Sequence, residues 1–493
     1  MAGRVPLAQR GAGLPGAVLD GLERIVGRGR LLTTVAERRA YARDSWPLAA
    51  LKVLHGADLE LPDAVVLPGS TAEVAAVVSL LYEHGVPVIP FGGGSGVLGG
   101  TTPVAGGVVL DLKRLDRVLA VDDASLTVTA QAGVLAVDLE ATLGRQGLTL
   151  GHFPQSIDVA TLGGLIATRS AGQFSTKYGN IEDLVLGLEV VLPEGRVIRT
   201  KVAARSSTGP DLKNLFVGSE GTLGVITEAT LRVRPRPEKR VGRAYELERF
   251  HDGLEVVRRV LRTGLAPAVV RLYDPVEAQH SFREWVEQGR SLLVLVCEGL
   301  GRLVDLEVQV VEETLADFPH RALGPAPAEH WLERRNVVAA LPEFMSQGLV
   351  VDTLEISTTW DRVGALYDAV LARMLAVRGV VAATAHSSHA YTHGTNLYLT
   401  FVALGPDLAE AERVYQEAWH AAMSACLEVG GTIGHHHGVG LQRRPWMAAE
   451  HGEALEVLRR LKAALDPRGL MNPGKLLPPP DAGARGDGKG GLR

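Results

Sequence analysis

Three consecutive histidines lie in a glycine frame, GHHHGVG (434–440), and imidazole side chains titrate near neutral pH. In an extended segment alternate side chains share a face, so we expect His435 and His437 to point together and His436 to oppose them. Two chemistries suit this group. One is acid–base catalysis, and the other is chelation of a metal ion with further nitrogen ligands from His386, His389 or His393.

A second group is built from backbone rather than side chains. Six of the nine residues from 92 to 100 are glycines, within VPVIPFGGGSGVLGG (86–100). A backbone with so few Cβ atoms turns tightly and presents several N–H groups to one anion. The loop also contains the G-x-G-x-x-G spacing of a Rossmann site, but that site requires a helix directly afterwards. Here TTPVAGG follows, which opposes a helix, and then a predicted strand at 108–112. The loop therefore predicts a diphosphate cofactor other than NAD.

Two further side chains lie in apolar, strand-like stretches. Tyr398, in NLYLTFVA, is either a sheet tyrosine or a proton acceptor. A free phenol has a pKa of about 10, so the second role needs cationic neighbours, and the three histidines would supply them. Arg271, in VVRLYD, either forms a salt bridge with a carboxylate such as Asp274 or binds an anionic substrate.

The overall composition excludes several classes of protein. The 493 residues carry 51 basic and 56 acidic side chains, a net charge of −5, which argues against a nucleic-acid partner. Two distant cysteines form neither a disulfide framework nor a thiolate metal site, so we expect a cytoplasmic protein. No apolar run reaches the length of a membrane span, and we expect no signal peptide.

The elements between these groups predict an α/β domain followed by an α+β domain. Ser70 and Glu73 form a capping box that starts a helix over 70–84, and 184–200 is typical of a hairpin. Gly163-Gly164 interrupts a stretch that is otherwise able to form a helix, which indicates a close approach of backbone. We expect these segments: 1–55 helical, 56–237 a cofactor-binding domain, 238–425 a cap or substrate domain, 426–477 a C-terminal segment that carries the histidines and packs back on the first domain, and 478–493 a disordered tail.

Five motifs in order resemble the flavin-binding oxidoreductases of the vanillyl-alcohol oxidase type over nearly the whole chain. They are PFGGGSGVLGG (90–100), GHFPQSIDVATLGG (151–164), YGNIEDLVLG (178–187), GSEGTLGVITEATL (218–231) and DPRGLMNPGKL (466–476). Within that group the chain is most similar to the alkyldihydroxyacetonephosphate synthases, through HHHGVG (435–440), the arginine of PAVVRLYD (267–274) and the tyrosine of GTNLYLTF (394–401). The glycolate and D-lactate dehydrogenases are the second choice.

The resemblance implies an α+β fold, with a two-subdomain FAD-binding domain and an α+β cap. It also implies which residues hold FAD. Those assigned to the diphosphate are Pro90, Gly92, Gly93, Gly94, Ser95 and Gly96; those along the isoalloxazine and ribityl side are Pro154, Asp158, Thr161, Gly164, Thr168, Ser170 and Ala171; those at the adenosine half are Glu220, Thr222, Gly224 and Ile226. The glycine loop contains no histidine or cysteine, so we expect FAD to be bound non-covalently.

The two branches of the family imply different chemistry. In the synthases the tyrosine that matches Tyr398 takes a substrate proton, an adduct forms at flavin N5, and a fatty alcohol replaces the acyl group. The resemblance then makes His435, His436 and His437 acid–base groups and places Arg271 and His152 beside the substrate. In the dehydrogenases the arginine grips a carboxylate and hydride passes to the flavin. Their metal-associated GDGNLH segment reads HGTNLY here, so we expect no metal.

One departure from the synthase pattern concerns a second arginine. The synthases carry LRD upstream of a segment that reads EISTTWDRV (355–363) here, and this chain has Leu341-Pro342-Glu343 at that place. Arg334 or Arg335 is a possible substitute. The resemblance also implies a homodimer, and a lipid-like substrate implies transient peripheral contact with a membrane.

Overall fold

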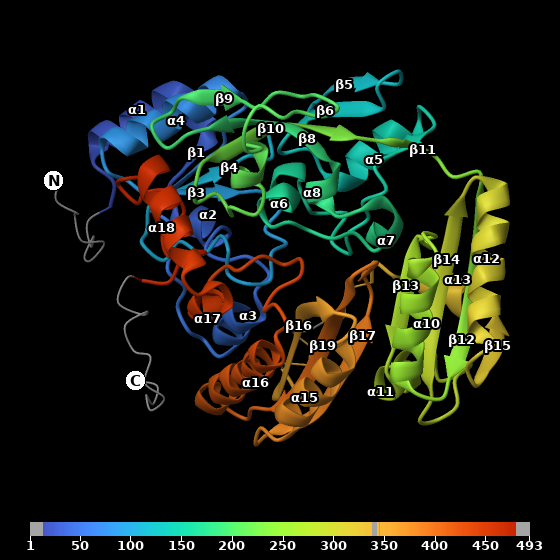
Figure 1. Cartoon of the computed structure of the whole chain (residues 1–493). Helices are drawn as coiled ribbons and strands as arrows, with labels where there is room; N and C mark the ends of the chain where they lie inside the picture. The colour runs from blue at the N-terminus through green and yellow to red at the C-terminus, as the bar shows by residue number, and fades with distance from the viewer. Residues whose placement is uncertain (1–12, 338–342, 345, 480–493) are drawn as a thin grey trace.

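The computed structural model describes residues 13–337, 343–344 and 346–479, which form two domains (Figure 1). The first domain begins with a four-stranded sheet in the order β1-β2-β4-β3, in which β2, β4 and β3 run parallel. Parallel strands are buried on both faces, which explains the continuous apolar runs of β2 and β4. The elements here are α1 (Gly16–Val26), η1 (Arg28–Arg30), β1 (Leu31–Leu32), α2 (Val35–Arg39), α3 (Pro47–Leu54), β2 (Ala64–Val66), α4 (Thr71–Glu83), β3 (Val88–Phe91) and β4 (Val108–Asp111).

A second sheet of this domain is antiparallel, in the order β5-β6-β10-β8-β9. Its apolar face packs against α5 and α6 around a separate core. Its elements are β5 (Val118–Asp122), β6 (Thr127–Gln131), α5 (Ala136–Gly144), β7 (Leu148–Thr149), α6 (Leu162–Ala167), α7 (Ser175–Tyr178), α8 (Ile181–Leu184), β8 (Val185–Val191), β9 (Val197–Arg199), α9 (Lys213–Phe216), β10 (Val225–Arg232) and β11 (Arg234–Pro235).

The second domain is a cap built on one large antiparallel sheet, in the order β15-β12-β14-β13-β17-β19-β16, with β18 paired to β19. Its elements are β12 (Lys239–Leu247), α10 (Phe250–Arg262), β13 (Val269–Tyr273), α11 (Pro275–Phe282), β14 (Ser291–Gly299), α12 (Gly301–Leu315), β15 (His320–Gly324), α13 (Ala326–Arg334), β16 (Leu349–Thr359), α15 (Val363–Leu375), β17 (Val380–Ser387), β18 (Ala390–Tyr391), β19 (Gly394–Leu404) and α16 (Leu408–Val429).

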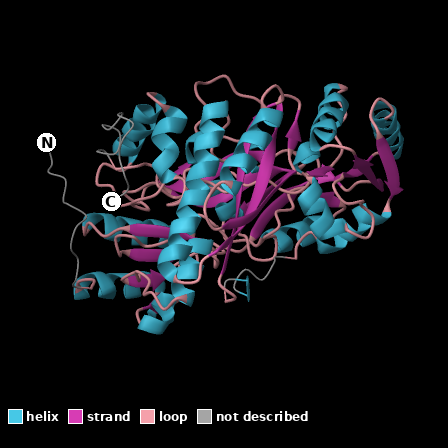
Figure 2. Ribbon diagram, turned by 90° about the horizontal axis from the view of Figure 1, so that it is seen from below, coloured by secondary structure: helices cyan, strands magenta, loops and turns pink. Residues whose placement is uncertain are grey.

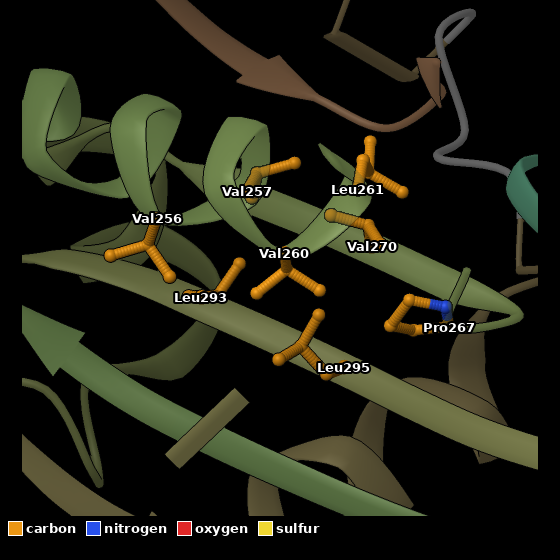
Figure 3. Close-up of a pocket in the computed structure, with 8 residues that line it drawn as sticks. All are labelled: Val256, Val257, Val260, Leu261, Pro267, Val270, Leu293 and Leu295. Carbon is orange, nitrogen blue, oxygen red and sulfur yellow. The ribbon is translucent and has the colours of Figure 1, made fainter. Parts of the chain in front are cut away.

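The two faces of the cap sheet differ in character. On the outer face, α10 packs on β13 and β14 and encloses a void of about 10 Å³, lined by Val256, Val257, Val260, Leu261, Pro267, Val270, Leu293 and Leu295 (Figure 3). A hydrocarbon-lined space of about one water molecule's size stays dry and binds no substrate. Successive strand residues alternate between faces, so Arg271 points to the opposite side from Val270. The polar side chains of the cap therefore gather on the inner face.

The C-terminal segment returns from the cap to the first domain. After η2 (Arg444–Trp446), α17 (Met447–His451) and α18 (Ala454–Leu465) lie beside the N-terminal elements in Figure 1. Lys462 Nζ donates to the Thr222 carbonyl at 2.7 Å, and Met471 forms a β-bridge with Val88. Figure 2 shows the strands enclosed by helices. No described helix has the length and apolar character to cross a membrane.

Several local predictions are confirmed and one is wrong. Ser70 caps α4 and accepts a hydrogen bond from the Glu73 N–H, but the Glu73 carboxylate accepts the Gly69 N–H, so only half of the capping box forms. A strand follows the glycine loop as expected. The Gly163-Gly164 pair does not interrupt a helix, because both residues lie within α6. A close approach still explains Gly163, since a Cβ there would lie 2.7 Å from the Ala132 Cβ.

Candidate functional site

The glycine loop after β3 packs against the 157–164 segment so tightly that side chains are excluded. A Cβ on Gly93 would lie 1.8 Å from the Val159 carbonyl oxygen, and one on Gly92 would lie 2.2 Å from Thr161 Oγ1. Gly94 has a φ of +66°, a conformation that favours glycine. The structure thus brings together two of the segments that we assigned to FAD.

The same loop offers a row of unused donors. Within the described part of the chain, no backbone N–H from Gly92 to Val97 donates a hydrogen bond to the protein. Consecutive free N–H groups in a half-buried loop form a concave site for an anion. A diphosphate fits this donor set because its oxygens accept several such bonds at once.

His152 supplies a second unsatisfied group next to a predicted flavin-binding residue. Its Nε2 lies 2.9 Å from Ser170 Oγ, while its Nδ1 is buried without a partner among the described residues. The side chain is 1% exposed, and burial lowers its pKa to about 3. We expected His152 beside the substrate. The structure places it against Ser170, a predicted flavin-binding residue, and its role beside the substrate stays a prediction.

Glu220 connects the first domain to the histidine loop. Its side chain accepts the N–H groups of Val439 and Gly440, and its carbonyl accepts Asn472 Nδ2 at 2.7 Å. Its carboxylate is thus already engaged by the backbone of the HHHGVG motif. The adenosine contact that the resemblance implied for Glu220 stays a prediction, as do those of Thr222, Gly224 and Ile226. All four residues are buried.

The histidine triplet does not adopt the alternating geometry that we expected. Residues 435–437 form a bend rather than an extended strand. The rings of His435 and His436 lie 5.0 Å apart with their Nδ1 atoms 2.8 Å apart, and both rings contact His389. The bend therefore brings neighbouring rings together, and His435 and His436 share one cluster.

His435 and His436 also lack the positive charge that we expected the triplet to give Tyr398. Burial lowers the pKa of His435 to about 4 and that of His436 well below its usual value, so both rings are neutral at pH 7. Burial raises the pKa of Tyr398 to about 12, and its bond to Thr353 Oγ1 at 3.0 Å offsets only part of that effect. Tyr398 thus keeps its proton in the resting site.

Arg271 has no carboxylate partner at salt-bridge distance among the described residues. Its Nε donates to Tyr273 OH at 2.8 Å, and a terminal nitrogen lies 2.7 Å from His386 Nε2. His386 is held in turn by Glu277 at 2.8 Å, and its ring stacks on Tyr398 with centroids 4.9 Å apart. The predicted alternative of a salt bridge to Asp274 is wrong, because that carboxylate caps α11 instead.

A buried ion pair forms hydrogen bonds with the backbone of the histidine loop. Glu355 and Arg443 are both fully buried and form two hydrogen bonds of 2.8 and 2.7 Å. The same carboxylate accepts the N–H groups of His436 and His437, and its Oε2 lies 2.7 Å from His437 Nδ1. Although burial opposes ionisation, Arg443 and His437 hold the pKa of Glu355 well below its usual range. Glu355 lies directly opposite Tyr398 in the β16–β19 pairing.

Other predicted residues are placed as follows. Ring nitrogens of His389, His435 and His436 lie within 4.8 Å of one another, a spacing that also suits a metal ion, and our expectation of no metal stays a prediction. His393 is exposed and lies outside that cluster. Pro342 lies outside the described residues. Arg334 is exposed, whereas Arg335 bonds Gln173 Oε1 at 3.0 Å and lies over the rings of Phe153 and Phe174.

Sequence reasoning missed four residues of this site. Glu355 and Arg443 were not weighed because an ion pair between residues 88 positions apart has no local signature. Asn180 and Tyr391 were missed for the same reason: Asn180 Nδ2 donates to Tyr391 OH at 2.9 Å, and that hydroxyl lies 2.7 Å from His435 Nε2. For Glu355 the available signal was a carboxylate inside the otherwise largely apolar strand β16.

Comparison with known proteins agrees with this geometry. Residues 62–201 match the family model for an FAD binding domain, and residues 236–476 match the model for the C-terminal domain of FAD linked oxidases. An uncharacterized FAD-linked oxidoreductase of Escherichia coli (strain K12), YgcU, is 33% identical over 94% of this chain and 98% of that protein.

Two functionally named relatives represent the two branches. The alkyldihydroxyacetonephosphate synthase of Dictyostelium discoideum is 33% identical over 87% of this chain and 75% of its own length. The glycolate oxidase subunit GlcD of Bacillus subtilis (strain 168) is 30% identical over 84% of this chain and 89% of its own length. A solved structure of alkyldihydroxyacetonephosphate synthase superposes with a TM-score of 0.80 at 26% identity, covering 96% of this chain and 89% of that one.

The predicted cofactor and fold are thereby confirmed: FAD is the cofactor, and the fold is the two-domain, mixed α and β fold of these flavoenzymes. The free N–H groups of the glycine loop and the unpartnered His152 nitrogen are suited to hold it. The chain belongs to the FAD-linked oxidase family and is an FAD-dependent enzyme.

Proposed function

We propose that this protein exchanges the acyl group of acyl-dihydroxyacetone phosphate for a fatty alcohol, as an alkyldihydroxyacetonephosphate synthase does. The observation that carries the proposal is the position of Arg271. Its guanidinium has no carboxylate at salt-bridge distance among the described residues, and His386 links it to the ring of Tyr398. A phosphate bound by Arg271 would hold the rest of a small substrate beside Tyr398 and the histidines.

In this proposal the binding role and the proton-accepting role fall to different residues. Arg271 binds and orients the anionic substrate, and Tyr398 takes a proton from it. The pKa of Tyr398 is about 12 in the resting site even with the Arg271 charge nearby, so substrate binding must lower this pKa before Tyr398 accepts a proton. Bound FAD supplies an electrophilic ring that takes up either a carbon nucleophile or a hydride.

A second candidate is the oxidation of a 2-hydroxy acid, and two observations favour it. His435 and His436 are neutral imidazoles, which suits removal of a hydroxyl proton near pH 7. One guanidinium is also enough to bind a carboxylate through two hydrogen bonds. This chain has only one of the two arginines of the synthase pattern, since Pro342 stands at the place of the second. In this reading Arg271 holds the carboxylate and a histidine is the base.

One experiment separates the two candidates. The visible spectrum of the purified holoprotein is recorded without oxygen, first with a panel of D-2-hydroxy acids and then with acyl-dihydroxyacetone phosphate plus hexadecanol. Formation of an ether product with no lasting bleaching supports the exchange reaction, and its loss in Tyr398→Phe supports the role of Tyr398. Bleaching by one hydroxy acid, with no ether product, overturns the exchange reaction in favour of the oxidation.

Four further expectations accompany this proposal. We propose that FAD is bound non-covalently, that the site holds no metal, that the protein is a cytoplasmic homodimer, and that its lipid-like substrate brings it into transient contact with a membrane surface. Acid precipitation that releases free FAD, metal analysis of the pure protein, sedimentation equilibrium and vesicle co-flotation test them in turn. The domain limits at residues 56, 238 and 426 are proposed alongside and are testable by limited proteolysis.

A further inference from the structure

A chain of hydrogen bonds leads out of the histidine cluster. His436 Nδ1 lies 2.8 Å from His435 Nδ1, and His435 Nε2 lies 2.7 Å from Tyr391 OH. Asn180 ends the chain with both atoms of its amide: Nδ2 lies 2.9 Å and Oδ1 3.2 Å from the same hydroxyl. Among the described residues, no hydrogen bond reaches the Nε2 atom of His436, which leaves that nitrogen for a reacting group.

Two arrangements of hydrogens satisfy this chain. In the first, His436 Nδ1–H donates to His435, His435 Nε2–H donates to Tyr391, and the Tyr391 hydroxyl donates to Asn180 Oδ1. In the second every donor and acceptor is reversed, and Asn180 Nδ2 donates to the hydroxyl. Moving one proton along the chain converts the first arrangement into the second, and the amide accommodates both because it carries a donor and an acceptor.

Tyr391, the last residue of the chain before Asn180, also borders a polar cleft. Tyr391 lines a cleft of about 400 Å³ together with Ser357, Thr358, Thr359, Arg362, His393, Gly394, Thr395, Gly430 and Thr432. His393 is exposed and its ring stacks near that of Tyr391 at 5.9 Å. Water and small buffer molecules fit a cleft of this size and polarity. Tyr391 therefore lies between the buried histidines and solvent.

Both candidate reactions need such an exit. In the exchange reaction the alcohol loses its hydroxyl proton while the fatty acid leaves as a carboxylate, so one proton is released. In the oxidation the hydroxyl proton is released separately from the hydride. Because burial depresses the pKa of both His435 and His436, neither ring retains an added proton at neutral pH.

We propose that Tyr391 relays the proton released in the active site from His436 and His435 to the polar cleft. A proton enters at His436 Nε2, the Nδ1–H shifts to His435, the His435 Nε2–H shifts to Tyr391, and the hydroxyl proton passes to water or buffer in the cleft. The chain is reset when both imidazoles change tautomer and the Tyr391 hydroxyl turns back to Asn180 Oδ1, so that the proton does not retrace its path. The relay rests on the proposed function only in that the site releases a proton, whichever substrate supplies it.

A measurement without substrate tests the relay separately from the function. Histidine side chains are labelled with ¹⁵N in the full-length holoprotein, and exchange of the ring N–H protons with water is followed by NMR. We expect exchange at His435 and His436 to slow at least about tenfold in Tyr391→Phe, since its ring keeps the shape and loses the hydroxyl. Tyr367→Phe makes the same atomic change on α15, where the ring stacks on Phe250, and should leave the exchange unchanged.

Added imidazole distinguishes a relay from a structural effect. Imidazole enters the cleft and should restore exchange in Tyr391→Phe in proportion to its concentration, whereas a distorted site would not be restored. Unchanged exchange in Tyr391→Phe, or slowed exchange that imidazole does not restore, overturns the relay. If exchange behaves as expected but no tested substrate turns over, the proposed function fails and the relay stands.

Discussion

The two binding regions of this molecule are built in opposite ways. In the glycine loop the backbone N–H groups of six consecutive residues, 92 to 97, have no acceptor among the described residues. The cap site uses side chains from β13, β16, β17, β19 and the 435–437 bend, which are up to 166 residues apart from Arg271 to His437. A backbone site is visible in a short stretch of sequence, whereas a side-chain site exists only once the sheet has formed.

The difference also appears in what each region tolerates. In the glycine loop the constraint is space, because a Cβ on Gly93 would overlap the Val159 carbonyl and one on Gly92 would overlap the Thr161 hydroxyl. In the cap site the constraint is pairing, because the buried polar side chains Glu355, Arg443 and His386 need their partners. Substitutions that add atoms should therefore damage the glycine loop, and substitutions that remove charges should damage the cap site.

Gly93→Ala should have the largest effect. The new Cβ would lie 1.8 Å from the Val159 carbonyl, so the loop or the 157–164 segment must move and the donors lose their alignment. We expect FAD affinity to fall by about 100-fold or more, measured by fluorescence titration of the apoprotein. Gly144→Ala, where a Cβ meets nothing within 4 Å, is the control and should bind FAD normally. Normal affinity in Gly93→Ala would contradict the space constraint.

Glu355→Gln should have the next largest effect, on the stability of the cap site. Removing one partner leaves the Arg443 charge buried and unpaired, which costs about 3–5 kcal/mol in the free energy of unfolding. Denaturant unfolding measures it. Glu456→Gln breaks an exposed pair with Arg460 and should cost less than about 1 kcal/mol. Equal losses of unfolding free energy in the two variants would show that the buried pair stabilises the protein no more than the exposed pair does.

Arg271→Met should separate substrate binding from cofactor binding. Loss of charge-assisted hydrogen bonds to an anionic substrate should raise its KM about 10- to 100-fold, while the flavin spectrum stays unchanged. Steady-state kinetics on whichever substrate turns over give the ratio. Arg373→Met removes an arginine that pairs with Glu428 on the outer helices and should leave KM as in the wild type. A normal KM in Arg271→Met would show that Arg271 does not bind the anionic substrate.

His152 should produce the smallest effect, a pH dependence of stability. Its pKa is about 3 in the folded protein and about 6.5 when unfolded, so the unfolded state binds a proton first as pH falls. Its contribution is complete above pH 6.5 and decreases toward pH 3. Between pH 7 and pH 5 the wild type should lose about 2 kcal/mol more than His152→Gln.

Urea unfolding at the two pH values measures the difference. His251→Gln, a change at a surface histidine bonded to Asp368, should retain the wild-type dependence. If His152→Gln loses as much stability as the wild type over this pH range, the buried ring is not the source of the effect.

Sequence reasoning predicted the local elements and the backbone site better than the side-chain site. The α4 cap and the strand after the glycine loop depend on a few adjacent residues, and both are confirmed. The cofactor followed from five motifs in order and is confirmed by the family matches. Each of these features depends on residues that lie close together in the sequence, so a short stretch of sequence is enough to predict it.

Only part of the cap site was predicted from the sequence, and its electrostatics were not. Arg271, Tyr398 and the histidines do gather on the inner face of one sheet. The protonation expected for them was wrong, because burial makes His435 and His436 neutral and keeps Tyr398 protonated. Burial depends on long-range packing, and so does the Glu355–Arg443 pair that fixes the loop.

The contacts of Glu220 have a consequence for the order of synthesis. Its buried carboxylate accepts hydrogen bonds from the N–H groups of Val439 and Gly440, and its carbonyl accepts one from Asn472. A nascent chain that has reached only residue 237 contains the whole glycine loop but none of these partners. The flavin domain therefore cannot reach its native packing on the ribosome until the last fifty or so residues have emerged.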